Sequence, residues 1–165
     1  MNIDIDPVHS EEYIHRVAVL AKDIWGSYYP HIIGDAQTEY MISLFQSRPA
    51  ITHQIQSEGY LYYLIHTEDE DVGYFSFKEE RLSLFLSKIY VKPTCQRKGI
   101  SSQIFAFLER WCETHQLSRI YLTVNRDNEH AIRAYEKNGF NIIRSQVSDI
   151  GNGYVMDDYV MEKQL

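Results

Sequence analysis

The chain has 165 residues, the usual size of one domain, so we expect residues 1–165 to fold as a single domain. Hydrophobic residues make up 44% of the chain and charged residues 24%, with only 8 Gly and 4 Pro, and this composition excludes disordered and fibrous proteins. The net charge of −7 at pH 7 argues against nucleic-acid binding, because nucleic-acid-binding domains usually present a strongly basic face.

The N-terminal sequence "MNIDIDPVHSEEYIHR" is acidic where a signal peptide needs positive charge. No apolar run approaches the roughly 20 residues that span a bilayer. These observations predict a cytoplasmic protein with no membrane contact. Cys95 and Cys112 lie before and near the end of one predicted helix, and at ~1.5 Å per residue this spacing is too long for a disulfide. We therefore expect free thiols, as in a reducing compartment.

The first half of the chain predicts a weak edge strand, three helices and three strands. "MNIDI" alternates weakly, and apolar residues at helical spacing predict a helix over 11–28. A short helix over 38–46 and a weaker one after Pro49 follow. Three runs rich in aromatic and β-branched residues, separated by short polar turns, then predict an antiparallel meander. These runs cover residues 60–67, 71–78 and 82–91.

The second half alternates between helices and strands. An amphipathic helix begins at Ile100, and residues 119–124 form a buried strand. The next helix has Asn128 in the position of an N-cap and Gly139 in that of the left-handed residue past its end. A final pair of strands closes the chain.

The stretch "VKPTCQRKGIS" joins the third meander strand to the amphipathic helix. A helix N-terminus presents unpaired N–H groups and a partial positive charge, and is therefore a ready anion site. Gly99 removes a side chain that would keep a phosphate from the backbone, Arg97 and Lys98 add positive charge, and Ser101 is small. The turn lacks both familiar nucleotide motifs, G-x-x-x-x-G-K-[ST] and G-x-G-x-x-G, so an ordinary helix start is the alternative.

The charges around this turn are uneven. Between Arg81 and Leu108 there is no Asp or Glu. This pattern indicates either a solvated basic face or a locally bound polyanion. The same region carries five positive side chains: Arg81, Lys88, Lys92, Arg97 and Lys98.

A second constellation lies in the helix that follows Asn128. Asn128, Ala131 and Tyr135 stand at i, i+3 and i+7, which places them on one helical face. We expect the apolar packing to come from the face of Ile132, so that this polar face meets a ligand or solvent. For Tyr135 alone, packing in the core is the alternative.

The two constellations together resemble the acetyl-CoA-binding core of the GNAT superfamily of N-acetyltransferases. The family pattern of Gln or Arg, two residues, Gly, one residue, then Gly or Ala maps onto Gln96, Gly99 and Ser101, with Ser101 in place of the usual Gly or Ala. The Asn, small residue, Tyr and Gly-Phe of the next family segment map onto Asn128, Ala131, Tyr135, Gly139 and Phe140.

The resemblance implies an α/β (α+β) GNAT fold. Its central sheet would be mixed, mostly antiparallel and twisted, with about six to seven strands and about four flanking helices. The third meander strand and residues 119–124 would run parallel and splay apart, and coenzyme A would enter that split.

The resemblance also implies which residues bind acetyl-CoA, with no metal. Asn128 would hydrogen-bond the pantetheine arm, and Ala131 would leave it room. The arm would pair with the backbone of Ile89, Tyr90 and Val91. The pyrophosphate would bind the turn residues Gln96, Arg97, Lys98, Gly99, Ile100 and Ser101.

The implied reaction is direct attack of a primary amine on acetyl-CoA in a ternary complex. An alkylammonium has a pKa near 10.4, so a base must remove a proton. Tyr135, as in the family, would be the general acid for the thiolate, and backbone N–H groups near Tyr90 and Val91 would stabilise the oxyanion. Many relatives carry a glutamate on the strand before the turn, but none stands between Arg81 and Val91. A water relay to Glu79, His31 or a tyrosine is the remaining option for the base.

The acceptor is expected to be a small-molecule amine or a peptide amine, and the layout weakly resembles polyamine-type members. Trp25, Tyr28 and Tyr29 are candidates to receive it, and Asp157 or Asp158 to pair with its ammonium, although each also fits a structural role. A homodimer is a further possibility that the family suggests.

Two rival interpretations stay open. The first is a non-catalytic acyl-CoA-binding sensor or interaction module, and the second is a different small α/β nucleotide binder. Cys95 is a poor candidate for an acetylated nucleophile, because it would lie at the phosphate end of the cofactor.

Overall fold

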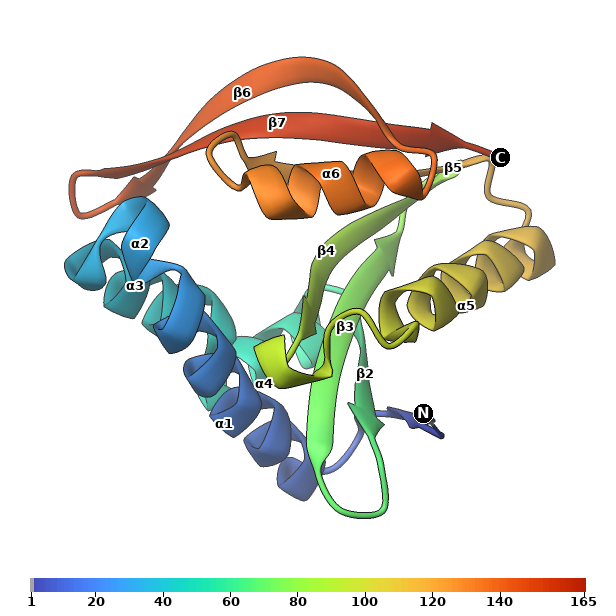
Figure 1. Ribbon diagram of the computed structural model, residues 1–165, viewed down its shortest axis with the longest axis horizontal. Helices are drawn as coiled ribbons and strands as arrows, with labels where there is room; N and C mark the ends of the chain where they lie inside the picture. Colours follow the sequence, from blue (N-terminus) through green and yellow to red (C-terminus); the bar gives the residue numbers. More distant parts are fainter. Residues whose placement is uncertain (1) are drawn as a thin grey trace. The chain divides into compact units, whose positions relative to one another are not determined.

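Seven strands form a mixed sheet with the order β1-β2-β3-β4-β5-β7-β6 (Figure 1). The computed structural model describes residues 2–165. The strands are β1 (Asp4–Pro7), β2 (Leu61–His66), β3 (Asp71–Glu79), β4 (Ser83–Val91), β5 (Arg119–Asn125), β6 (Asn141–Gly151) and β7 (Tyr154–Gln164). The helices are α1 (Glu11–Tyr28), α2 (Pro30–Ile33), α3 (Asp35–Met41), the π-helix η1 (Ile42–Gln46), α4 (Arg48–Ser57), the 3-10 helix η2 (Pro93–Cys95), α5 (Ile100–His115) and α6 (Glu129–Lys137).

The expected mixed and largely antiparallel sheet is confirmed. β4 and β5 pair in parallel, whereas β1 with β2, β2 with β3, and β7 with both β5 and β6 pair antiparallel. The parallel register covers three residue pairs, from Ser83 with Arg119 to Phe85 with Tyr121. Because β4 continues to Val91, its last residues lie beyond the recorded pairing with β5.

The chain divides into two compact units. The N-terminal unit comprises the residues up to Lys78 together with Lys88–Ile104, and the C-terminal unit comprises Glu79–Ser87 and Phe105–Leu165. The predicted turn therefore belongs to the N-terminal unit, and the helix with Asn128 and Tyr135 to the C-terminal unit.

In the N-terminal unit, α1 and α4 pack on one side of β2 and β3 (Figure 1). α1 begins where the sequence predicts because Ser10 caps it, its side chain accepting a hydrogen bond from Tyr13 N at 3.1 Å. α1 then buries an apolar stripe that includes Val17 and Ala21. α4 starts at Arg48, earlier than predicted, because Ser47 caps it and proline is tolerated in the first helical turn.

The helix predicted over residues 38–46 is two elements. α3 begins at Asp35, and the chain continues from Met41 into the π-helix η1. Short π-helical segments are rare and often lie at functional sites. The hydrophobic pattern does not distinguish them from an α-helix.

β3 and the end of β4 approach each other closely at Gly73. A Cβ atom on Gly73 would lie 2.6 Å from the carbonyl oxygen of Tyr90 and 3.3 Å from Cα of Val91. Lys92 N donates to Val72 O at 2.9 Å just beyond this point. Glycine is therefore required by backbone contact rather than by a turn.

In the C-terminal unit, α5 and the strands β5, β6 and β7 are connected by polar contacts as well as by apolar packing. Lys163 Nζ donates to Glu109 Oε1 at 2.6 Å, which places α5 on the face of β7 that carries Lys163. The predicted caps of α6 are confirmed: Ala131 N donates to Asn128 Oδ1 at 3.3 Å, and Gly139 has φ of 91°.

Both cysteines are free, as predicted, and both are buried. Among residues 2–165, no helix combines the length and apolarity that crossing a membrane requires.

Replacing Gly73 with alanine should destabilise the protein by roughly 1–3 kcal/mol, because a methyl group would be forced into the backbone of β4. Gly26 is the matched control: it lies inside α1, and a Cβ there meets nothing within 4 Å. Gly26→Ala should stabilise the protein by up to about 1 kcal/mol through helix propensity. Urea unfolding measures both, and a Gly73→Ala variant as stable as the wild type would show that the strands can separate freely.

Candidate active site

The turn between β4 and α5 has a strained backbone. After η2, Arg97 has φ of 62° and Gly99 has φ of 80°, and α5 then begins at Ile100. A left-handed conformation favours glycine, so Gly99 is required here on conformational grounds alone. A Cβ on Gly99 would meet nothing within 4 Å, so the space beside its backbone is open. The first N–H groups of α5 face this turn without helical partners.

The cations of the turn differ from the other basic side chains nearby. Arg97 and Lys98 are exposed, and no residue in the range 2–165 is recorded as pairing with either. Lys92, in contrast, lies 3.4 Å from Glu70 Oε2. Gln96 Nε2 donates to Val91 O at 3.3 Å, which fastens the turn to the end of β4. Two positive charges without a recorded partner among residues 2–165 therefore lie beside the start of α5.

The second predicted constellation lies at the start of α6. Asn128 is 4% exposed and acts as the N-cap, and the half-buried Ala131 follows in the first turn. The Tyr135 ring lies edge-on to Phe105 with ring centroids 6.2 Å apart, and at 6.0 Å from the Phe140 ring. The apolar contacts of α6 thus include Tyr135 itself. None of the residues of α6 is fully buried, and this includes Ile132, which we expected to supply the packing.

The aromatic residues predicted for the acceptor side come together in the N-terminal unit. Trp25 stacks on Tyr29 with centroids 4.1 Å apart and lies at 5.5 Å from the Tyr90 ring. Tyr28 is edge-on to Tyr29 at 5.7 Å, and Tyr90 also contacts Tyr74 at 5.4 Å. The end of α1 and the end of β4 therefore share one aromatic cluster. Trp25 is 3% exposed and Tyr74 is fully buried, so part of this cluster belongs to the core of the N-terminal unit.

Asp157 and Asp158 have different surroundings although they are adjacent in β7. Asp157 Oδ1 accepts a hydrogen bond from Arg126 Nε at 2.9 Å, and the Arg126 guanidinium lies over the Tyr159 ring. Asp158 is 3% exposed, and no hydrogen bond or ion pair of its carboxylate is recorded among residues 2–165. Burial, followed by the charge of Asp157, raises the pKa of Asp158 to about 6.

The burial of Lys88 is a feature that the sequence did not indicate. It was expected among the positive charges near the turn, but its residue is 6% exposed. Its Nζ donates to Phe45 O at the end of η1, to Gln54 Oε1 of α4 at 3.0 Å and to the Tyr62 hydroxyl of β2. Burial lowers the pKa of Lys88 to about 7, while Glu58 opposes this shift. The only signal of this burial in the sequence was the position of Lys88 in the alternation of β4, which points its side chain inward.

These local arrangements agree with what family comparison finds. Residues 13–140 match the acetyltransferase (GNAT) family. The chain belongs to the GNAT family. No curated protein sequence matches it significantly.

Solved structures share this GNAT fold at low sequence identity. The PaiA N-acetyltransferase from Thermoplasma acidophilum in complex with coenzyme A is 21% identical, with a TM-score of 0.82 and 100% coverage of both chains. The ribosomal-protein alanine N-acetyltransferase from Escherichia coli is 17% identical, with a TM-score of 0.72 over 99% of this chain and 94% of that one. A chimera of the spermidine N-acetyltransferase SpeG from Vibrio cholerae and hSSAT is 18% identical, with a TM-score of 0.69 over 99% of this chain and 96% of the other.

The two tentative bases of this GNAT protein have different surroundings. Glu79 Oε1 accepts a hydrogen bond from Trp111 Nε1 at 2.7 Å and lies 3.9 Å from His115, so α5 side chains hold it. His31 is exposed on α2. No group of three or more metal-ligating side chains occurs within residues 2–165.

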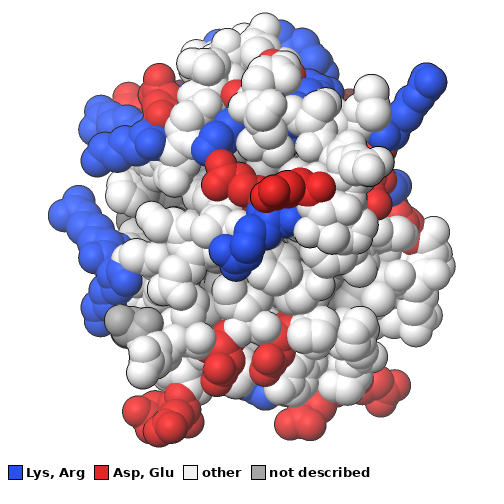
Figure 2. Space-filling model, turned by 90° about the vertical axis from the view of Figure 1, so that its right-hand side faces the viewer, with Lys and Arg blue, Asp and Glu red and all other residues white. Residues whose placement is uncertain are grey.

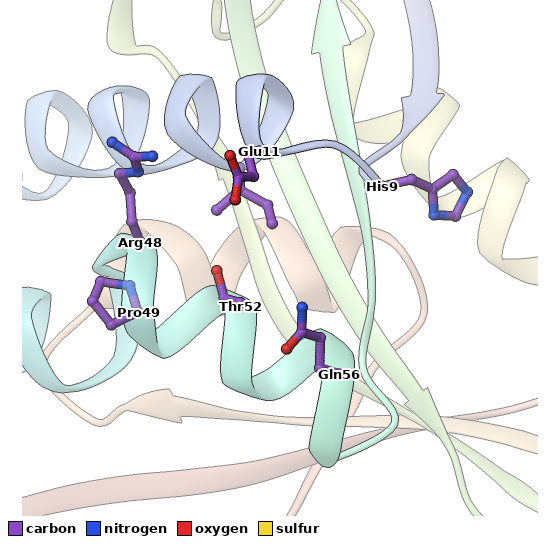
Figure 3. A pocket seen from close by; sticks show the side chains of 7 residues that line it. His9, Glu11, Arg48, Pro49, Thr52 and Gln56 are labelled. Carbon is purple, nitrogen blue, oxygen red and sulfur yellow. The ribbon is translucent and has the colours of Figure 1, made fainter.

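A separate cavity of about 460 Å³ opens between the start of α1 and α4 (Figure 3). Its accessible lining surface is mostly apolar, and none of the predicted site residues lines it. Its lining is His9, Glu11, Ile14, Arg48, Pro49, Thr52 and Gln56.

Acidic and basic side chains both occur on the molecular face shown in Figure 2.

Lys88 should make stability depend on pH in a specific direction. Because its pKa is about 7 in the folded protein and near 10.5 in the unfolded chain, the unfolded state binds more protons between these values. The free energy of unfolding should therefore rise with pH across this window, by at most about 1.4 kcal/mol per pH unit.

Urea unfolding of the wild type and of Lys88→Met between pH 6 and pH 10 isolates this contribution, because the variant should lack it. Lys22→Met removes an exposed lysine of α1 and is the control for a simple loss of charge. Parallel pH curves for the wild type and Lys88→Met would contradict the assigned burial of the ammonium.

Proposed function

We propose that the chain is an acetyl-CoA-dependent N-acetyltransferase that acts on a primary amine of a small molecule or peptide by direct attack in a ternary complex. The observation that carries this proposal is the turn at residues 96–101. Its left-handed glycine, the open space beside that glycine and two cations with no recorded partner among residues 2–165 coincide with the position at which the GNAT pattern binds pyrophosphate.

The residues at this turn fit the diphosphate of coenzyme A. Gly99 leaves the backbone accessible, and the amides at the start of α5 can donate to phosphate oxygens while Arg97 and Lys98 neutralise the charge. Gln96, Ile100 and Ser101 complete the set. Bound acetyl-CoA supplies an activated acetyl group as its thioester.

The chain's own groups then serve the transfer. We assign the pantetheine arm to the backbone of Ile89, Tyr90 and Val91 and to Asn128, with Ala131 leaving space. The parent thiol has a pKa near 8.5, so a proton from Tyr135 helps the thiolate to leave but is not essential. Backbone N–H groups near Tyr90 and Val91 are assigned to the oxyanion.

The acceptor is proposed to enter beside the aromatic cluster of Trp25, Tyr28 and Tyr29. Tyr28 and Tyr29 are partly exposed, and an accessible aromatic face attracts an organic ammonium, which supports an amine acceptor. The names of two structural relatives, a spermidine N-acetyltransferase and a ribosomal-protein alanine N-acetyltransferase, support amines as the substrate class.

The double variant Arg97→Ala/Lys98→Ala should weaken coenzyme A binding by about 10- to 100-fold, which is roughly 0.7–1.4 kcal/mol for each cation, because solvent screens charge-assisted hydrogen bonds of exposed side chains. Pantetheine, which lacks the diphosphate, should bind the wild type and the variant equally. Isothermal titration calorimetry measures both ligands. Arg133→Ala, which removes an exposed cation of α6, is the control. An equal loss for both ligands would contradict the assignment of the turn to the diphosphate.

Tyr135→Phe should lower kcat by a factor within or below ~10² to 10⁴ and leave coenzyme A affinity nearly unchanged. Thiol release from acetyl-CoA, measured over a panel of polyamines, amino acids, aminoglycosides and peptide N-termini, first identifies an acceptor. Unchanged turnover of the variant with that acceptor would remove Tyr135 from the reaction. Coenzyme A binding without turnover of any amine would instead favour a sensor module.

A further inference from the structure

The cavity between the start of α1 and α4 lies wholly within the N-terminal unit and has no part in the proposed reaction (Figure 3). Its volume of about 460 Å³ falls in the range of about 300–1,000 Å³ that small-molecule sites occupy. The cavity is separate from the aromatic cluster at the other end of α1. Ile14 lines the cavity and Trp25 belongs to the cluster, and at ~1.5 Å per residue they lie about 16 Å apart along the helix.

Two opposite charges line this cavity from different helices and do not pair with each other. Glu11 is the first residue of α1, and Arg48 is the first residue of α4. Figure 3 shows both side chains beside the cavity. No ion pair or hydrogen bond of either charged group is recorded among residues 2–165, whereas Arg16 and Asp71 of the same unit do pair. The cavity therefore offers one carboxylate and one guanidinium to a ligand.

Neutral hydrogen-bonding groups extend the α4 side of the cavity. Arg48, Thr52 and Gln56 stand at i, i+4 and i+8, which places them on one face of α4. Figure 3 shows these side chains directed toward α1. No hydrogen bond of the Thr52 hydroxyl or the Gln56 amide is recorded among residues 2–165. Both groups are thus available to a polar ligand.

The rest of the lining is suited to an apolar group. The accessible lining surface is mostly apolar, and it includes Ile14, which is 7% exposed, and Pro49. Covering apolar surface contributes about 25 cal/mol per Å². A wholly apolar ligand would cover this surface but would also take the two charges out of water without a partner, which is costly. The lining therefore favours a ligand that is apolar at one end and carries both charges at the other.

We propose that this cavity binds a free α-amino acid with an aliphatic side chain. Near neutral pH such a molecule carries one ammonium and one carboxylate. The ammonium pairs with Glu11, the carboxylate accepts hydrogen bonds from Arg48, and the side chain covers Ile14. A ligand with a single charge would pair with one of the two side chains and be repelled by the other. This second site goes beyond the proposed function and does not depend on it.

The test compares leucine with two molecules of similar shape that each lack one of its charges. 4-Methylpentanoate lacks the ammonium, and 3-methylbutylamine lacks the carboxylate. Titration of the ¹⁵N-labelled full chain, followed by amide NMR, gives an affinity and a location for each. Leucine should bind about 3- to 10-fold more tightly than either analogue, because ion pairs of exposed side chains are screened by solvent. Its signals should shift at residues 9–14 and 48–56 and not at residues 25–29.

Two variants separate the two charges. Glu11→Gln should weaken leucine binding by about 3- to 10-fold and leave 4-methylpentanoate binding no weaker than in the wild type. Arg48→Ala should weaken both of these ligands and leave 3-methylbutylamine binding no weaker. Glu12→Gln is the matched control, since Glu12 is an exposed neighbour in the first turn of α1 that does not line the cavity. Lys22→Ala is the control for loss of an exposed cation.

Three results would overturn the proposal. The first is the absence of any shift with leucine, and the second is a set of shifts confined to residues 25–29, which would place the amino acid at the aromatic cluster. The third is an equal loss of leucine binding in Glu11→Gln and Glu12→Gln. The measurement uses no acetyl-CoA, so a failure of the proposed acetyl transfer is distinguished from a failure of this site.

Discussion

The short pairing between β4 and β5 is the constraint on which the rest of the structure depends. The parallel register ends at Phe85, while β4 continues for six more residues to Val91. Backbone groups beyond that point must find other partners or a ligand, because an unpaired buried N–H or C=O is costly. Gly73 permits a close approach of β3, and the Gln96 side chain binds Val91 O. The same turn that ends β4 is thereby fixed beside the start of α5.

One buried ammonium connects several elements of the N-terminal unit. Lys88 joins β4 to η1, α4 and β2 through three oxygen acceptors, none of them a carboxylate. A single ammonium with three neutral acceptors has directional hydrogen bonds but little Coulombic compensation, which is why burial lowers its pKa. The π-helix η1 ends where its Phe45 carbonyl reaches this ammonium. An apolar residue in place of Lys88 would remove this donor to Phe45 O, while Gln54 Oε1 would still accept from the Tyr62 hydroxyl.

Local sequence signals predict most of the fold because the local and tertiary requirements agree. Ser10 precedes an apolar stripe of helical period, and α1 occupies the predicted residues 11–28. The glycine turn and the Asn128 cap are likewise local features, and both appear at the predicted positions. The unusual backbone of η1 leaves no such signature, because π- and α-helices share the same apolar spacing.

The fate of a charged side chain is harder to predict, since it depends on residues distant in sequence. The hydrogen-bond acceptors of Lys88 lie on β2, η1 and α4, and the residues adjacent to it in sequence do not predict them. The alternation of a strand predicts that Asp157 and Asp158 point to opposite faces, but only the fold shows that Arg126 pairs with the first. Glu79 is a further example: the sequence offered its carboxylate as a candidate base, but in the fold it accepts a hydrogen bond from Trp111.

The absence of any fully buried residue in α6 has a consequence for how that helix stays ordered. A nine-residue helix is below the length at which isolated helices persist in water, so contacts outside its hydrogen-bond ladder must stabilise it. Here these include the Asn128 cap and the packing of Tyr135 on Phe105 and Phe140. α6 therefore depends for its order on a cap at its start and one aromatic contact near its end, and the helix should fray if either is lost.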